Sequence, residues 1–253
     1  MLLIDKPITK TPLQCIKNVR ENIPKLRKEK IAYAGRLDPM AHGLLLLLVG
    51  PETKNRHNYQ NIDKKYEFGV LFGISTDTYD LMGIPKFTNP KTVTKNDLEN
   101  IVLIFSKTVE QPYPPYSSKT VNGKPLYWYA KNKKMRTIKI PTKQIEVFDL
   151  KFLGLKKIGA KQIRNKVRTI KTVDGDFRQE KIMEAWDDVF SKYPKKNYQI
   201  AKFTIHCSSG TYVRQITHDM GRKLRIGSLA YDIKRTRIGE FKLKDTIKLE
   251  FSS

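Results

Sequence analysis

The sequence contains few of the residues that build disulfide-linked, metal-binding or membrane-anchored proteins. The two cysteines, Cys15 and Cys207, lie far apart and form no C-x-x-C pair, which argues against a disulfide framework or a thiolate zinc site. The four histidines show no metal-ligand spacing, and no glycine-rich phosphate-binding motif is present. No apolar run approaches membrane-spanning length, and the first residues lack a signal-peptide core. These absences predict a soluble cytoplasmic protein that needs neither a metal nor a nucleotide cofactor.

Acidic residues are also scarce. The chain has 25 Asp and Glu against 49 Lys and Arg, so its formal net charge is +24. Such a field attracts polyanions and accelerates their encounter, and nucleic acid is the obvious partner. A lysine-rich proteome explains part of this excess but hardly all of it. At 253 residues, without a repeat or a convincing linker, the chain is predicted to fold as a single domain, 1–253, with a sizeable core.

Two long stretches contain no acidic residue at all. The first, from Gln111 to Ile145, interleaves eight basic residues with Tyr113, Tyr116, Tyr127, Trp128 and Tyr129. The second, from Gly154 to Thr172, holds seven basic residues. Phosphates bind Lys and Arg, whereas unpaired bases stack on aromatic rings. Each stretch alone could be a solvated face with its aromatics packed inward, but the two together favour an RNA-binding surface.

Helix and strand patterns alternate without a regular βαβ rhythm, which predicts an α+β fold. Thr11-Pro12-Leu13-Gln14 has the form of a helix start with a capping box, and Thr94 and Asp97 could cap a helix that carries Leu98, Ile101, Val102 and Phe105. Thr211 could cap a third helix, with Val213, Ile216 and Met220 on one face. Alternating or continuous apolar residues predict strands at Leu2–Ile4, Leu44–Val49, Tyr66–Phe72, Ile145–Phe152, Ala201–Cys207 and Leu229–Ile233.

Asp38 is the most informative acidic residue. It lies in Gly35-Arg36-Leu37-Asp38-Pro39, shortly before the apolar run from Leu44 to Val49. A carboxylate drawn out of water beside such a run needs a cation or hydrogen-bond donors. The simpler interpretation is an Asp-Pro turn with Asp at its first position. Arg36 is a nearby counter-charge for Asp38, and Arg214, in Gly210-Thr211-Tyr212-Val213-Arg214, is a distant one.

Asp77 and Asp80 form a second acidic group, three residues apart in Ser75-Thr76-Asp77-Thr78-Tyr79-Asp80. Two carboxylates at this spacing could act as an acid–base pair. Because Asp and Thr in loops commonly bind backbone groups, we favour a role as turn caps.

Several ordered motifs resemble the TruB family of tRNA pseudouridine synthases. The resemblance covers nearly the whole chain except roughly 155–194, and five ordered motifs make it specific. They are Gly35–Leu45, Lys64-Lys65-Tyr66, Thr76–Asp80, Pro112–Lys119 and Cys207–Arg214, and Arg235–Phe241 near the end also resembles a family segment.

The resemblance implies a pseudouridine synthase fold, with a mixed, mostly antiparallel sheet flanked by helices and a catalytic cleft. It implies isomerisation of the T-loop uridine of tRNA, position 55, without cofactor or metal. We expect the protein to act as a monomer. Asp38 would be the catalytic carboxylate, acting on the base, on the ribose or by a glycal-type route. Five residues would bind substrate: Tyr66 by stacking on the flipped uracil, Arg214 by pairing with Asp38, Tyr212 as a pocket wall, Leu224 beneath the base, and Lys64 as support for the Tyr66 strand.

Some positions depart from the family's pattern. Tyr33 stands where the bacterial pattern usually has histidine, and Arg36 resembles the Arg-x-Asp order of synthases that modify ribosomal RNA. The chain also ends soon after Phe241, so we expect no C-terminal PUA domain, and the basic insertion near 155–194 could replace its RNA contacts. Two alternatives stay open: a non-catalytic RNA-binding or tRNA-folding factor, and a synthase acting on another RNA such as rRNA.

Overall fold

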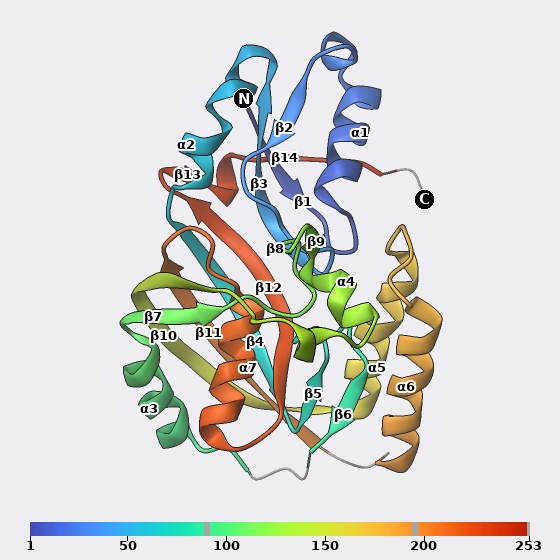
Figure 1. Ribbon diagram of the computed structural model, residues 1–253, viewed down its shortest axis with the longest axis vertical. Helices are drawn as coiled ribbons and strands as arrows, with labels where there is room; N and C mark the ends of the chain where they lie inside the picture. The colour runs from blue at the N-terminus through green and yellow to red at the C-terminus, as the bar shows by residue number, and fades with distance from the viewer. Residues whose placement is uncertain (89–91, 194–196, 252–253) are drawn as a thin grey trace.

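One large sheet organises the molecule. The computed structural model describes residues 1–88, 92–193 and 197–251, and in these residues ten strands form a sheet (Figure 1). Strands pair in parallel only between β1 and β14 and between β12 and β3, so the predicted mixed, mostly antiparallel sheet is confirmed. The order across the sheet is β14 (Ile247–Lys248), β1 (Leu2–Lys6), β3 (Ala41–Val49), β12 (Ser228–Ile238), β4 (Lys64–Phe72), β11 (Asn197–Cys207), β10 (Thr142–Gly159) and β7 (Thr108–Pro112), with β2 (Ile31–Tyr33) beside β3 and β13 (Phe241–Lys242) beside β12.

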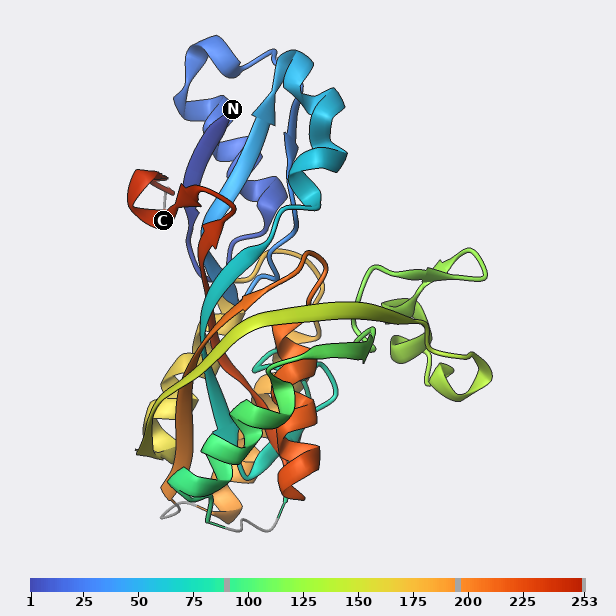
Figure 2. The ribbon, with the colours of Figure 1, turned by 90° about the vertical axis from the view of Figure 1, so that its left-hand side faces the viewer.

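Helices cover the two faces of the central strands (Figures 1 and 2). On β4, Tyr66, Phe68 and Val70 point into a core shared with α3 (Lys95–Phe105) and α7 (Val213–Leu224). Leu71 points to the other face, where α5 (Ala160–Arg168) and α6 (Gln179–Lys192) pack. This alternation follows from the two-residue period of a strand. At the N-terminal end, α1 (Pro12–Asn22) packs on β1 and β3, and the short α2 (Arg56–Gln60) precedes β4.

An arm projects from the sheet between β7 and β10 (Figure 2). It comprises residues 113–141 and carries the hairpin β8 (Thr120–Val121) and β9 (Lys124–Pro125), followed by α4 (Leu126–Lys131). Pro114, Ser117, Leu126 and Tyr129 are its buried residues, whereas its lysines are exposed. The first acid-free stretch therefore forms a separate, mostly basic projection.

The predicted helices and strands are present, and two of the helices begin where they were predicted. Both predicted helix caps are confirmed, and each is a capping box: the side chains of Thr11 and Gln14, and of Thr94 and Asp97, bind each other's backbone N–H groups. All six predicted strands are present. The predicted Thr211 cap is wrong, because its hydroxyl donates to the carbonyl of Ser208 at 2.8 Å and Tyr212 occupies the cap position.

Several elements were not predicted, among them two helices and a pair of short strands. Helices α5 and α6 fill the variable region, and β5 (Ile74–Thr76) pairs with β6 (Pro85–Phe87) in a small separate sheet. In the described part of the chain, the helices are too short or too polar for any of them to cross a membrane.

Candidate active site

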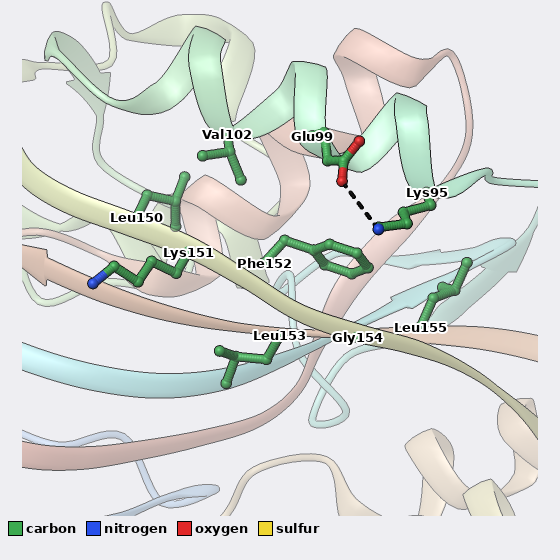
Figure 3. Close-up of a pocket in the computed structure, with 9 residues that line it drawn as sticks. All are labelled: Lys95, Glu99, Val102, Leu150, Lys151, Phe152, Leu153, Gly154 and Leu155. Atoms are coloured by element: carbon green, nitrogen blue, oxygen red, sulfur yellow. Dashed lines mark ion pairs between the residues drawn. The ribbon is translucent and has the colours of Figure 1, made fainter.

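Two hollows in the described structure are large enough for a small ligand, and their chemistry differs. The first, about 820 Å³, lies between α3 and β10 and is lined mainly by apolar side chains and backbone (Figure 3). Its one carboxylate, Glu99, is paired with Lys95 at 3.5 Å. The second, about 660 Å³, contains Asp38, Tyr66, Tyr212 and Arg214. The second hollow therefore brings together the site residues singled out in the sequence except Leu224, and we take it as the candidate site.

Asp38 occupies a tight turn at this cavity. The N–H of Ala41 donates to the carbonyl of Asp38 at 3.0 Å, so the predicted turn with Asp at its first position is present. The next residue, Pro39, is fixed by Thr9, whose N–H donates to its carbonyl at 2.8 Å. The Lys6 Nζ donates to the same carbonyl at 3.3 Å. The turn thus aims the Asp38 side chain while the backbone behind it is held from the N-terminal segment.

Lys6 itself is fully buried, and its ammonium also donates to the carbonyls of Pro7 and Lys10. Burial lowers the pKa of Lys6 to about 8, although the nearby Cys15 and Asp38 act in the opposite direction. A buried ammonium is tolerated only with such partners. The Lys6 ammonium therefore places a positive charge at the end of β1, directly behind the Asp38 turn.

Arg214 is the counter-charge of Asp38. Its Nε donates to Asp38 Oδ2 at 2.7 Å and lies 3.5 Å from Asp80 Oδ2. The remaining donors reach the carbonyls of Thr78 at 2.6 Å and Tyr116 at 3.4 Å. Burial alone would lower the pKa of Arg214, but the two carboxylates outweigh it and raise the pKa above its usual value. The guanidinium therefore stays charged and is fixed from three sides.

The sequence offered Arg36 and Arg214 as partners of Asp38, and the structure pairs Asp38 with Arg214. Arg36 does not pair with Asp38; its Nη2 donates to the hydroxyl of Tyr33 at 3.2 Å. The guanidinium of Arg56 lies 5.2 Å from the centre of the Tyr33 ring. The two positions that depart from the family's pattern are thus in contact with each other, at the rim of the same cavity.

Asp77 and Asp80 act as turn caps, as predicted, and also form ion pairs. Asp80 Oδ1 accepts from the Thr78 hydroxyl at 2.6 Å and from the Met82 N–H at 2.9 Å. Asp77 Oδ1 accepts from the Ile84 N–H at 2.8 Å, and its other oxygen pairs with Arg178. Asp80 is nearly inaccessible to solvent, and this burial raises its pKa despite Arg214. The sequence argument recognised the caps but missed Asp80 as the second partner of Arg214.

Aromatic and aliphatic side chains form the walls. Tyr66 is 8% exposed and lies at the cavity beside Ile233, while Tyr212 lines another part of the wall. Burial raises the pKa of both tyrosines, so both hydroxyls stay protonated. The fully buried Arg235 interacts with the Tyr66 side chain, and its Nε donates to the carbonyl of Leu44 at 2.7 Å. The wall is therefore apolar, with fixed hydrogen-bonding groups at its base.

Lys64 lies at the same cavity. Its ammonium donates to the carbonyls of Gln60 and Ile62, at the start of the strand that carries Tyr66. Burial, followed by the charge of Arg235, lowers the pKa of Lys64 to about 8. This position agrees with the predicted support of the Tyr66 strand.

The predicted place of Leu224 beneath the base is wrong. It is the last residue of α7, ten positions after Arg214, and it packs against the core shared by α3 and α7 rather than lining the cavity. Ten residues of helix span about 15 Å, which separates it from the catalytic end. Ile233 lines the wall instead. In the sequence it was visible only as an apolar residue of the alternating pattern that became β12.

A metal centre is not apparent in this part of the chain. Among the described residues, no group of three or more His, Cys, Asp or Glu side chains is placed to hold an ion. The carboxylates near the cavity are instead engaged by arginines and backbone N–H groups.

Comparisons with known proteins agree with this arrangement. A family model described as TruB family pseudouridylate synthase (N terminal domain) matches residues 24–173. The tRNA pseudouridine synthase B of Caldicellulosiruptor saccharolyticus is 28% identical over 253 residues, which cover 100% of this chain and 72% of that protein. The tRNA pseudouridine synthase B of Aquifex aeolicus is also 28% identical, over 98% of this chain and 71% of its own.

A solved structure shows the same fold. A chain of a Cbf5–Nop10–Gar1 complex superimposes with a TM-score of 0.61 at 17% identity, over 98% of this chain. The present chain spans 52% of that chain's length. The likeness supports the predicted α+β pseudouridine synthase architecture at the level of the fold.

Proposed function

The chain belongs to the TruB family of pseudouridylate synthases, and on that premise we propose that it isomerises a uridine of tRNA to pseudouridine. We further propose that the target is the T-loop uridine, position 55, and that residues 1–253 act as one catalytic domain in a monomer. The observation that carries the proposal is the ion pair between Asp38 and Arg214, 2.7 Å long, in a cavity walled by Tyr66 and Tyr212.

The reaction breaks the bond between uracil N1 and ribose C1′ and forms a bond between C5 and C1′, while one proton leaves C5 and N1 gains one. The glycosidic carbon is inaccessible in a stacked helix, so the nucleotide must be flipped into the cavity. There, Tyr66 is placed to stack on the uracil. Because atoms are only rearranged within the nucleotide, no co-reactant is needed.

Asp38 is the group that starts this rearrangement in our proposal. Attack on the base, attack on the ribose and removal of a ribose proton all require a carboxylate beside the reacting nucleotide. Asp38 is partly exposed, with 32% of its side chain accessible, so one face is free for the substrate. Arg214 holds the other face and offsets the charge as water is displaced. A tyrosine hydroxyl near the base could then move the C5 proton.

The arm supplies the features needed to bind the RNA around that nucleotide. The Lys124 ammonium lies 3.9 Å from the centre of the Trp128 ring, and the Lys134 ammonium lies 5.5 Å from it. Tyr127 and Lys131, also on the arm, line the cavity. Cations with aromatic rings between them suit a phosphate backbone with unpaired bases. We propose that the arm contacts the T-arm of tRNA next to the flipped uridine.

The test is direct. Purified protein is incubated with an unmodified tRNA transcript, pseudouridine is mapped at nucleotide resolution, and the assay is repeated with Asp38→Asn. We expect product at the T-loop uridine with the wild type and none with the variant, which should still bind the transcript. A wild type that binds tRNA without forming pseudouridine would favour the non-catalytic factor, and product only in an rRNA stem-loop would reassign the substrate.

A further inference from the structure

The insertion between β10 and β11 contributes to the candidate active site. Its helices, α5 and α6, pack on the sheet face opposite α7, yet the segment that joins them returns to the cavity. Asp176, Phe177 and Arg178 line the same cavity as Asp38. This segment lies outside the motifs that resemble the family, so no sequence motif indicated its position.

Arg178 has an unusual backbone conformation. Its φ of 63° and ψ of 31° place it in the left-handed region, directly before α6. For a residue with a long side chain this costs on the order of 1 kcal/mol, and it persists only where the surroundings fix it. Here Asp176 Oδ1 accepts from the Arg178 N–H at 3.2 Å, and the Gln179 side chain donates to the carbonyls of Val173 and Gly175. The conformation directs the guanidinium toward the cavity instead of along the helix.

The guanidinium of Arg178 clamps two residues that belong to different family motifs. It donates to Asp77 Oδ2 at 2.8 Å and to Oδ1 at 3.4 Å, and its carbon lies 4.5 Å from the centre of the Tyr116 ring. The Tyr116 hydroxyl donates to the same Asp77 oxygen at 3.0 Å. Burial, with the charge of Asp77, raises the pKa of Tyr116 to about 12, which keeps this donor protonated.

The two segments that Arg178 contacts also bind Arg214, the partner of Asp38. Arg214 donates to the carbonyl of Thr78, the residue after Asp77, and to the carbonyl of Tyr116. Arg178 therefore fixes the two segments whose carbonyls orient Arg214, and Arg214 in turn binds Asp38. In this series of described contacts, Tyr116 on one route and Asp77 with Thr78 on the other link Arg178 to the guanidinium of Arg214.

We infer that Arg178 is a positioning residue for the Asp38–Arg214 pair, and that the insertion is thereby a functional part of the active site. The inference rests on the proposed function. It differs from an RNA-binding role of the insertion, since Arg178 has its fork occupied by Asp77 rather than free for a phosphate.

The experiment measures single-turnover pseudouridine formation at saturating tRNA, together with the Kd for tRNA and its dependence on salt. For Arg178→Ala, we expect the rate to fall about 10-fold, because a misplaced catalytic group slows the chemical step. The Kd should change less than about 2-fold and its salt slope not at all. Arg178→Lys should recover part of the rate, since lysine can pair with Asp77 but cannot form the fork or stack on Tyr116.

Arg164→Ala is the matched control. Arg164 belongs to the same insertion and pairs with Asp187 at 3.0 Å, but it does not line the cavity. Its removal should leave the rate unchanged. The inference is overturned if Arg178→Ala is as fast as the wild type, if Arg164→Ala is equally slow, or if Arg178→Ala weakens binding with a smaller salt slope. A wild type without product would overturn the proposed function together with this inference, whereas an active wild type isolates the inference.

Discussion

Arg214 compensates two carboxylates that come from different segments. Asp38 is partly open to solvent, but Asp80 is buried and has no other cation within ion-pair distance in the described structure. The Nε of Arg214 faces both carboxylates, while its Nη1 and Nη2 donate to backbone carbonyls. This geometry makes Arg214 a structural and a chemical requirement at once.

Arg214→Ala is therefore expected to lower both stability and rate. Loss of one partner of a buried pair leaves Asp80 uncompensated, which costs about 3 kcal/mol. The rate at saturating tRNA should fall strongly with little change in binding, because Arg214 contacts Asp38 rather than the RNA surface. Urea denaturation and single-turnover assays measure the two effects. Arg214→Lys should restore part of the stability but little of the rate, since a point charge cannot hold all four partners. Equal losses of rate and tRNA affinity would instead place Arg214 on the phosphate backbone.

The Asp38–Arg214 pair could be predicted from the sequence, but not all of the residues that surround it. Asp38 and Arg214 were recognised because each lies in a long, ordered motif. Leu224 was misplaced because a motif position does not reveal how far a helix carries a residue from the site. Ile233 and Asp80 had visible local roles, as a strand residue and a turn cap, which concealed their places in the cavity wall.

The element that follows the Asp38 turn depends on a close backbone approach. Strand β3 runs parallel to β12, with Gly43 opposite Arg235. Gly43 has a φ of +97°, and a Cβ there would lie 2.4 Å from the Arg235 carbonyl oxygen. A side chain at this point would push β3, which follows the Asp38 turn, away from β12, which carries Arg235.

Gly43→Ala should consequently destabilise the fold by about 3 kcal/mol or more, since it combines backbone strain with a clash against main chain. Gly123→Ala provides the comparison. Gly123 has a φ of +75° in the β8–β9 hairpin, with nothing within 4 Å of the added Cβ, so strain alone should cost about 1 kcal/mol. Free energies of unfolding from urea titrations give both values. Equal losses at the two positions would show that the strands separate without penalty.

Helix α5 is tied to β12 by an ion pair that should depend on pH. Lys166 Nζ lies 2.6 Å from Asp232 Oδ1, and His42 Nε2 lies 3.5 Å from the other oxygen. Burial alone would raise the pKa of Asp232, but the hydrogen bond from His42 and the charge of Lys166 outweigh it and lower the pKa to about 2. A carboxyl group whose pKa is lower in the folded state stabilises the fold above its unfolded pKa and loses that contribution as pH falls.

Asp232→Asn is thus expected to cost about 1 kcal/mol at pH 7, a modest value because the pair is partly screened by solvent. The difference between wild type and variant should shrink from about pH 4 and disappear near pH 2, through the window between the unfolded and folded pKa. Thermal or urea unfolding across this range tests it. A difference that stays constant with pH would mean that packing, not charge, joins α5 to the sheet.

Local signals explain which elements could be predicted. The capping boxes at Thr11 and Thr94 were predictable because each involves residues only three apart. Thr211 failed because its hydroxyl has a competing acceptor, the Ser208 carbonyl, created by the turn that precedes it. Helix α6 carried a readable stripe of Ile182, Trp186, Val189 and Phe190, but its place on the sheet depends on long-range packing that periodicity does not contain.

For the molecule as a whole, the sheet separates the two basic stretches. The arm stands on the same side as α7 and reaches the cavity, whereas α5 packs on the opposite face (Figure 2). Net charge alone predicted a polyanion partner without indicating which surface receives it. Because both stretches looked alike in sequence, the insertion was also considered as an RNA-binding surface. Their positions in the fold now favour the arm.

Two variants with equal loss of charge can compare these surfaces. One variant replaces four exposed arm lysines with glutamine, and the other replaces four exposed insertion lysines with glutamine. Each variant lowers the net charge of +24 by four, so both lose the same long-range attraction for tRNA. The arm set is Lys119, Lys124, Lys134 and Lys139, and the insertion set is Lys156, Lys157, Lys161 and Lys171.

Each phosphate contact contributes about 0.7 to 0.9 to the slope of log K against log salt. We expect the arm variant to lose about 2 from that slope and to bind tRNA much more weakly, because the arm borders the cavity through Tyr127 and Lys131. The insertion variant should keep nearly the wild-type slope, since α5 faces away from the cavity. Binding isotherms at several salt concentrations separate these outcomes. A larger loss in the insertion variant would mean that tRNA wraps around the sheet edge onto α5, and the arm would then hold only the nucleotides closest to Asp38.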